Sequence, residues 1–252
     1  MSMGEKLEII AENVPKVFEA GKKARDEEWW NTYLAPMRAG KPSNNAFSGP
    51  CWNGNTFYPT QDIIPLENAT SMFERFSWNA SVARIDLAQR LEDCGVVLDI
   101  SNAKVVTYLF NYAWITRVPA LNCNTTTYSS LTNVFSNAPY LVTIDELIIR
   151  NDGTNNFTNT FDGSTSLKNI KFTGMIGRNI SFSSCPLSVE SLKNIILCLK
   201  DYTGLSEYSY TVTFKTSAFN ALEAEGATAE YNGTACTWAE LIGFKKWNLT
   251  KA

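Results

Sequence analysis

The chain has 252 residues and a mass of 28.1 kDa, and 44% of its residues are hydrophobic, enough to bury a substantial core without disulfide or metal staples. A net charge of −3 and a pI near 5.2 provide no basic field for a phosphate backbone, so we expect no nucleic-acid partner. The chain contains no histidine, which excludes Ser-His-Asp and Cys-His catalysis and metal sites with imidazole ligands.

Targeting and cofactor motifs are also missing from the sequence. The opening residues MSMGEKLEII contain no basic segment followed by a long apolar run, so we expect neither a signal peptide nor insertion into a membrane. No phosphate-binding glycine loop or EF-hand spacing occurs, so we expect no cofactor, no metal site and no catalytic residue. The six cysteines form no CxxC pair and predict free thiols.

Seven Asn-x-Ser/Thr triplets are scattered along the chain. We interpret them as a consequence of its richness in Asn, Thr and Ser. Their asparagines are Asn68, Asn79, Asn124, Asn156, Asn179, Asn232 and Asn248.

The first predicted element is a charged helix over residues 5–31, within an N-terminal arm of residues 1–35. Apolar residues recur in it at alternating spacings of three and four, the a/d pattern of a helical seam. Pro15 should kink or restart this helix. The seam fits packing on the chain's own domain as well as self-association into a homo-oligomer, such as a trimer. Its main residues are Leu7, Ile10, Val14 and Val17.

A repeated unit follows an irregular, Pro- and Gly-rich lead-in that begins at residue 36. The unit consists of an apolar residue, a Phe four positions later, and two aliphatic positions near the next strand. Its phenylalanines, at positions 76, 110, 135 and 161, are 34, 25 and 26 residues apart. The four copies are Met72, Phe76, Val82 and Ile85; Val106, Phe110, Ile115 and Val118; Leu131, Phe135, Leu141 and Ile144; and Phe157, Phe161, Leu167 and Ile170.

Such a short unit cannot bury its apolar face alone, so stacking of the units is expected. We therefore predict an α/β fold in which residues 36–185 form the lead-in and a short solenoid with stacked short strands, including 143–147 and 169–172. Asn133, Asn137 and Asn159 are expected in the connecting turns.

Residues 186–252 have a different pattern and predict a helix-strand segment that caps the solenoid. In chain order we expect a helix with Ser188 as N-cap, a strand at 210–214, a helix at 218–225, a turn at Asn232-Gly233, a capping box from Thr237 to Glu240, and an extended end from Trp247.

The repeats at residues 76–85, 110–118, 135–144 and 161–170 resemble the BspA-type leucine-rich repeats of bacterial surface proteins. The segments PLSVESL (186–192), DYTG (201–204) and WNLT (247–250), and the opening IAENVPKV (10–17), are similar to leucine-rich-repeat proteins encoded in phages and prophages of gut bacteria. Together these segments span most of the chain.

This resemblance implies a non-enzymatic binding or attachment module. For the bacterial class it implies surface adhesion, and for the phage-borne class a tail-associated, receptor-binding role on the virion. The partner would be a bacterial surface glycan or protein, or a phage structural protein. Few repeats, and no secretion signal or wall anchor in the sequence, favour the virion over the bacterial cell surface.

Carboxylates support the alternative, a glycosidase or lyase that needs no histidine. Asp86 and Asp145 share a repeat position, and we expect them two turns apart, roughly 10 Å. Asp145 and Glu146 are adjacent, so on a regular strand they would face opposite sides. Lys171 follows in the same column, and we expect it to pair with Asp145 in a solvated polar stripe.

Aromatic residues near the turns are the better candidates for a binding site. Aligned turns would form an exposed patch able to stack on sugars or anchor a protein. The alternative is that these rings cover the edge of the core. The residues are Trp78, Tyr112, Trp114 and Tyr140.

Overall fold

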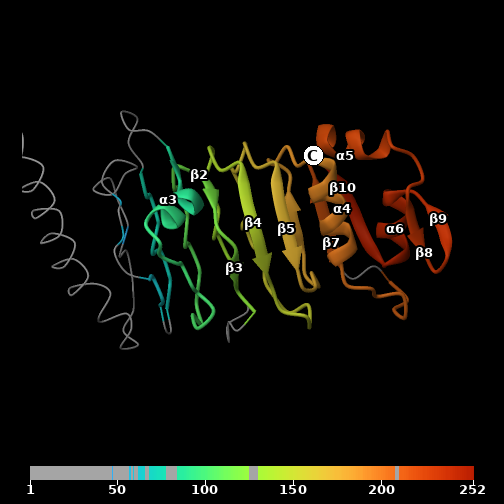
Figure 1. Cartoon of the computed structure of the whole chain (residues 1–252). Helices are drawn as coiled ribbons and strands as arrows, with labels where there is room; N and C mark the ends of the chain where they lie inside the picture. The colour runs from blue at the N-terminus through green and yellow to red at the C-terminus, as the bar shows by residue number, and fades with distance from the viewer. Residues whose placement is uncertain are drawn as a thin grey trace, which may run out of the picture.

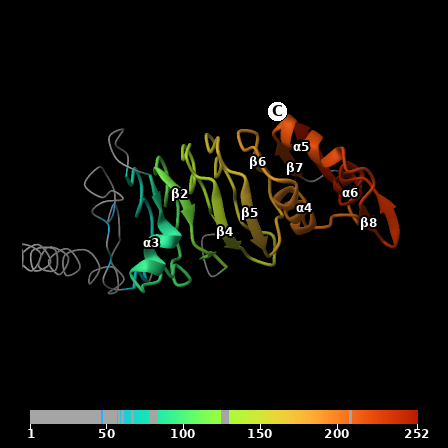
Figure 2. The ribbon, with the colours of Figure 1, turned by 45° about the horizontal axis from the view of Figure 1, so that its top comes forward.

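The structure, a computed structural model, describes residues 47, 57, 59, 62–65, 68–77, 84–124, 130–207 and 210–252. The predicted arm, with Leu7, Ile10, Val14 and Val17, lies outside the described residues, and so does Trp78. Within them the fold is mixed α/β, as expected, with ten strands and four helices. From residue 84 onward the described chain advances in one direction, from the strands in its middle to the helices near its C-terminus (Figure 2).

A parallel sheet occupies the middle of the described chain (Figure 1). Its strands β1 (Ile85–Asp86), β2 (Ile115–Val118), β4 (Thr143–Ile148) and β5 (Asn169–Thr173) follow one another, and β3 (Leu121–Asn122) also pairs with β4. The register places Val118 beside Ile144, and Ile144 beside Ile170. The last positions of three predicted units therefore lie next to one another, as stacking requires.

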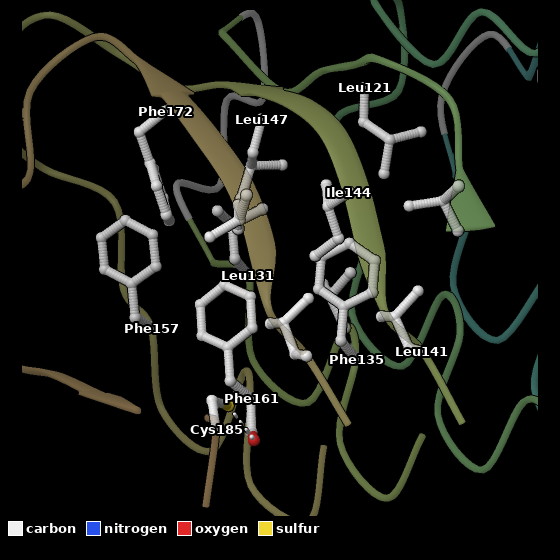
Figure 3. Close-up of a cluster of buried hydrophobic side chains, with 14 of the residues drawn as sticks. Leu121, Leu131, Phe135, Leu141, Ile144, Leu147, Phe157, Phe161, Phe172 and Cys185 are labelled. Carbon is white, nitrogen blue, oxygen red and sulfur yellow. Dashed lines mark hydrogen bonds between the residues drawn. The ribbon is translucent and has the colours of Figure 1, made fainter. Parts of the chain in front are cut away.

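Buried phenylalanine rings form a continuous column behind this sheet. Neighbouring rings are stacked, with centroids between 4.7 and 6.0 Å apart. Figure 3 shows Phe135 and Phe161 among the aliphatic side chains of β4 and its turns. Each ring fills the space between its own turn and the next one, which gives the core its repeat. The column consists of Phe73, Phe110, Phe135, Phe161, Phe182 and Phe214.

The key phenylalanine of the first predicted unit was placed three residues too late. Phe73, and not Phe76, stacks on Phe110, while Phe76 meets Phe73 edge-on at 5.4 Å and 81°. The backbone explains this difference: Phe73 N donates to Leu109 O, just as Phe110 N donates to Val134 O. Spacing to the next apolar residues suggested Phe76, because twelve residues separate Phe73 from Ile85, whereas five separate Phe110 from Ile115, the partner of Ile85.

The inserted helix, α3 (Leu87–Asp93), was not predicted. Asp86 is its N-cap and accepts a hydrogen bond from Gln89 N at 2.9 Å. The carboxylate expected to line up with Asp145 therefore caps a helix. The backbone of Asp86 is aligned with that of Arg117, because the register between β1 and β2 shifts between Ile85 and Asp86.

The turns repeat a left-handed backbone conformation at two positions. Asn133, Asn137 and Asn159 have φ values of 55°, 54° and 52°, which confirms their prediction as turn residues. Asparagine adopts this conformation at lower cost than most other residues. Tyr108 and Tyr112 occupy the same two positions one unit earlier, with φ values of 59° and 57°.

The C-terminal elements largely match their predictions. The strands β6 (Ile180–Phe182), β7 (Tyr210–Phe214) and β10 (Trp247–Lys251) form a second parallel sheet in the order β10-β7-β6. The hairpin of β8 (Ala229–Tyr231) and β9 (Thr234–Cys236) turns at Asn232-Gly233, and the Thr237 capping box begins α6 (Trp238–Phe244). Helix α5 spans Thr216–Glu223, two residues earlier than expected.

Helix α4 (Val189–Cys198) covers the edge of the first sheet (Figure 1). Ser188 caps it as predicted, and Ser191 Oγ accepts a hydrogen bond from Ile170 N at 2.9 Å. Asn194 replaces a neighbouring strand: its Oδ1 accepts from Phe172 N at 2.6 Å and its Nδ2 donates to Phe172 O at 3.1 Å. The exposed edge of β5 thus finds partners without another strand.

The phenylalanine column continues from Phe161 through Phe182 to Phe214, across the predicted boundary between residues 185 and 186. The division into residues 1–35, 36–185 and 186–252 stays a prediction.

We expect Asn194→Ala to lower the free energy of unfolding by about 1–3 kcal/mol, because it leaves the buried N–H of Phe172 without a partner. Urea unfolding measures this change. Asn220→Ala, on an exposed position of α5, is the matched control and should unfold at the same or slightly higher urea, since alanine favours helices. Equal midpoints for Asn194→Ala and the unaltered chain would contradict the edge-covering role.

Candidate functional site

Two of the predicted aromatic residues are brought together by the stacked units. Trp114 and Tyr140 precede equivalent positions of β2 and β4, and their rings meet edge-to-face at 5.2 Å. The exposed Arg84, which precedes β1, places its guanidinium carbon 3.8 Å from the centre of the Tyr140 ring and 6.0 Å from that of Trp114. Both rings are half-buried, so they combine contact with the core and a surface with positive charge.

Tyr112 lies apart from this pair. Its side chain is 40% exposed, and the Arg75 guanidinium lies over its ring at 5.9 Å. No ring contact joins it to Trp114 or Tyr140 within the described ranges. The four predicted aromatics therefore do not form one described patch, and Trp78 lies outside the described residues.

The adjacent carboxylates Asp145 and Glu146 both lie on the outer surface of the sheet, contrary to the expected opposite orientation. The register advances three residues from Ile144 to Leu147 but only two from Ile170 to Phe172, so β4 bulges here. Ile144 and Leu147 are buried, and both acids between them are partly exposed. A regular strand would have buried one of them.

Both carboxylates are committed to ion pairs. Arg117 holds Asp145 with two hydrogen bonds, Nε to Oδ1 at 2.7 Å and Nη2 to Oδ2 at 2.9 Å. Lys171 Nζ pairs with Glu146 Oε1 at 2.7 Å, so the predicted Lys171–Asp145 pair is wrong. Hydrogen bonds from Lys171 and Thr173 lower the pKa of Glu146. A general acid needs the opposite shift.

Sequence reasoning missed a polar groove on another face, where residues 154–159 face β6 and the start of β7. It has a volume of about 650 Å³ and lies open to solvent, within the size range of small-ligand clefts. Hydroxyl and amide side chains dominate its lining, together with one tyrosine and one arginine. Its polar lining includes Asn156, Thr158, Arg178, Ser181, Tyr210 and Thr213.

Two of the Asn-x-Ser/Thr triplets, at 156–158 and 179–181, lie in this groove. In each, the middle residue, Phe157 or Ile180, is buried at 3% exposure, while both flanking polar residues are exposed. This is the alternation of an extended segment with one buried face. The Asn-x-Ser/Thr triplets, which we explained by composition, were therefore the feature of the sequence that could have indicated the groove.

The same alternation continues on both sides of the groove. Thr70 Oγ1 lies 3.4 Å from Thr107 Oγ1, and Ser130 pairs with Asn156, which brings Thr132 beside Thr158. On the other side, β6, β7 and β10 place small hydroxyl residues at paired positions. The resulting hydroxyl column has two parts, one on each side of the groove: Thr70, Thr107, Thr132 and Thr158, and Ser181, Thr213 and Thr250.

Arg178 is the charged residue that lines the groove. Its Nη1 donates to Tyr210 Oη at 2.7 Å, and its guanidinium carbon lies 5.4 Å from the centre of the Tyr210 ring. The Tyr210 ring packs on its other neighbours Tyr202 and Trp247, at 5.5 and 5.8 Å. The arginine is therefore held by a partly buried tyrosine that itself packs against the core.

Other chemistry finds little support among the described residues. No group of three or more Cys, Asp or Glu side chains in these ranges could hold a metal ion. Cys185, Cys198 and Cys236 are free thiols, and burial raises the pKa of Cys185 to about 12, far from that of a nucleophile at neutral pH. None of the described helices combines the length and apolar character that crossing a bilayer requires.

The lowered pKa of Glu146 predicts a pH-dependent contribution to stability. Its ionised form is favoured by folding, so the contribution is present above the ordinary glutamate pKa and is lost as the pH falls through the lower pKa of the folded state. Glu146→Gln should therefore cost about 0.5 kcal/mol at neutral pH and less as the pH falls below about 4. Urea unfolding at several pH values measures this difference.

Glu230→Gln is the control, since Glu230 is exposed on β8 and has no ion pair among the described residues. It should leave the unfolding midpoint nearly unchanged at each pH. A constant difference between Glu146→Gln and the unaltered chain across the pH range would show that ionisation of Glu146 plays no part.

Comparisons with protein-family models, with curated proteins and with solved structures found no match for this chain.

Proposed function

We propose that this chain is a non-enzymatic attachment module built on a short solenoid of BspA-like leucine-rich repeats. Its setting is the tail of a phage or prophage particle, where it binds a bacterial surface polymer or docks to a tail partner. A bacterial surface adhesin is the second version of the same proposal. In both, the described units serve as a rigid support for a binding surface.

The hydroxyl column across the groove carries this proposal. Within each of its two parts, backbone pairing spaces the members at roughly 4.8 Å, so the same chemical group is offered at regular intervals on either side of the groove. A polymer of repeated sugars can use such a surface, because each residue of the polymer meets the same donors and acceptors.

The state of the carboxylates supports binding over hydrolysis. Asp145 and Glu146 share the outer face of the sheet, which a glycosidase could use, but each is neutralised by a cation at 2.7 Å. If the chain cleaves host glycans, mass spectrometry of incubated capsule or wall material will reveal fragments that Asp145→Asn abolishes. We expect no fragments.

Purified protein should bind envelopes of its host bacterium. We expect sedimentation with envelopes at micromolar concentration and a positive signal on an array of bacterial glycans. Removal of protein from the envelopes by protease should leave sedimentation unchanged if a surface polymer is the receptor. No binding to envelopes or array at high concentration would contradict recognition and leave an architectural role.

The N-terminal seam should drive self-association. Ile10→Asp places a charge in the seam, whereas Ala11→Asp places the same charge beside it on the predicted helix. Light scattering should give an oligomer for the unaltered chain and for Ala11→Asp, and a lower mass for Ile10→Asp. A monomer mass for the unaltered chain at micromolar concentration would contradict the proposal.

A further inference from the structure

We infer that the groove beside β6 binds a saccharide chain carrying anionic groups, with Arg178 as the group that receives the anion. The inference rests on the proposed function, because it names the class of polymer that the attachment module would bind. It depends on the charge of the groove, the state of its arginine and the chemistry of its walls.

The charge of the groove is positive and local. Arg178 is the charged residue of its lining, and no Asp or Glu lines it, although the whole chain carries a net charge of −3. Two other arginines are each neutralised by an aspartate. Arg117 Nε lies 2.7 Å from Asp145 Oδ1, and Arg150 Nη2 lies 2.6 Å from Asp152 Oδ2. Among the described residues, no carboxylate pairs with Arg178.

Arg178 is also held in place before any ligand arrives. Its bond to Tyr210 Oη uses one edge of the guanidinium, and the ring beneath limits its rotation. A planar guanidinium can still present parallel N–H groups to a carboxylate or phosphate, a geometry that a lysine ammonium does not offer. Fixing the arginine in advance lowers the entropy lost on binding.

The walls match the neutral part of such a ligand. Thr158 lies on one side, and Ser181 and Thr213 on the other, so sugar hydroxyls can find donors and acceptors across the groove. These side chains carry no charge, and short hydroxyl side chains lose little entropy when they form a bond. A chain of sugars lying along the hydroxyl column would thus place an acidic substituent within reach of Arg178.

Isothermal titration of the full chain against three oligomers tests this inference. One is an oligogalacturonate, the second is the same oligomer as its methyl ester, and the third is a sugar-substituted poly(glycerol phosphate). We expect binding to the carboxylate or phosphate oligomer that weakens with added salt, and at least about tenfold weaker binding to the methyl ester. Binding to both acidic oligomers identifies the shared anion as the determinant, and binding to one identifies the source.

Matched variants assign the effect to the groove. Arg178→Gln should weaken binding about tenfold, the loss of one charge-assisted contact, while Lys171→Gln removes an equal charge on the other face and should change nothing. Tyr210→Phe removes the bond that positions Arg178 and should weaken binding to the acidic oligomer while leaving that to the methyl ester unchanged. Circular dichroism and the unfolding midpoint identify any variant that fails to fold.

The outcomes separate this inference from the proposed function. Equal affinity for acid and ester, unaltered binding by Arg178→Gln, or no binding of either acidic oligomer would overturn the inference. If Arg178→Gln also sediments with envelopes as the unaltered chain does, attachment stands and the groove is not its site. If the unaltered chain does not sediment with envelopes but binds the acidic oligomer through Arg178, the proposed function fails and the assignment of the groove as an anion-binding site stands.

Discussion

Stacking of buried phenylalanine rings from successive turns is the contact on which the rest of this structure depends. Six rings follow one another at 4.7–6.0 Å, so each turn is positioned by the one before it. Because ring stacking sets the separation and the backbone ladders set the register, the same residue positions recur on the surface at regular intervals. The hydroxyl column and the Arg84–Trp114–Tyr140 cluster both follow from this regularity.

The last strand of a sheet built in this way has an open edge whose backbone groups need hydrogen-bond partners. The exposed edge of β5 is completed by α4, whose Ser191 and Asn194 side chains bond the backbone as a strand would. Lys245 Nζ in turn donates to the carbonyls of Ile196, Leu197 and Leu199 at the end of α4. The first sheet therefore stops at α4, while the phenylalanine column passes on to β6 and β7, and the groove lies where the two arrangements meet.

The repeat and the caps could be predicted from the sequence, because both are local. Apolar residues at a fixed spacing, asparagine in the turns, Ser188 and Thr237 before apolar runs, and alternation in β7 all act within a few residues. The first unit was misassigned because twelve residues, instead of five, separate its stacked Phe73 from the start of β1 at Ile85, and only the backbone hydrogen bonds between neighbouring turns place Phe73 instead of Phe76. Asp145 and Glu146 were assigned to opposite faces because a bulge leaves no signal in one strand.

The sequence by itself determined that apolar residues recur at a fixed spacing, and that Ser-His-Asp, Cys-His and imidazole-metal chemistry are excluded because the chain has no histidine. The tertiary structure decided which surface residues meet. Trp114 and Tyr140 come together while Tyr112 does not, and residues 154–159 come to lie beside Arg178 and Tyr210. The physical reason is that burial follows local periodicity, whereas a groove depends on the relative placement of segments far apart in the chain, which only packing fixes.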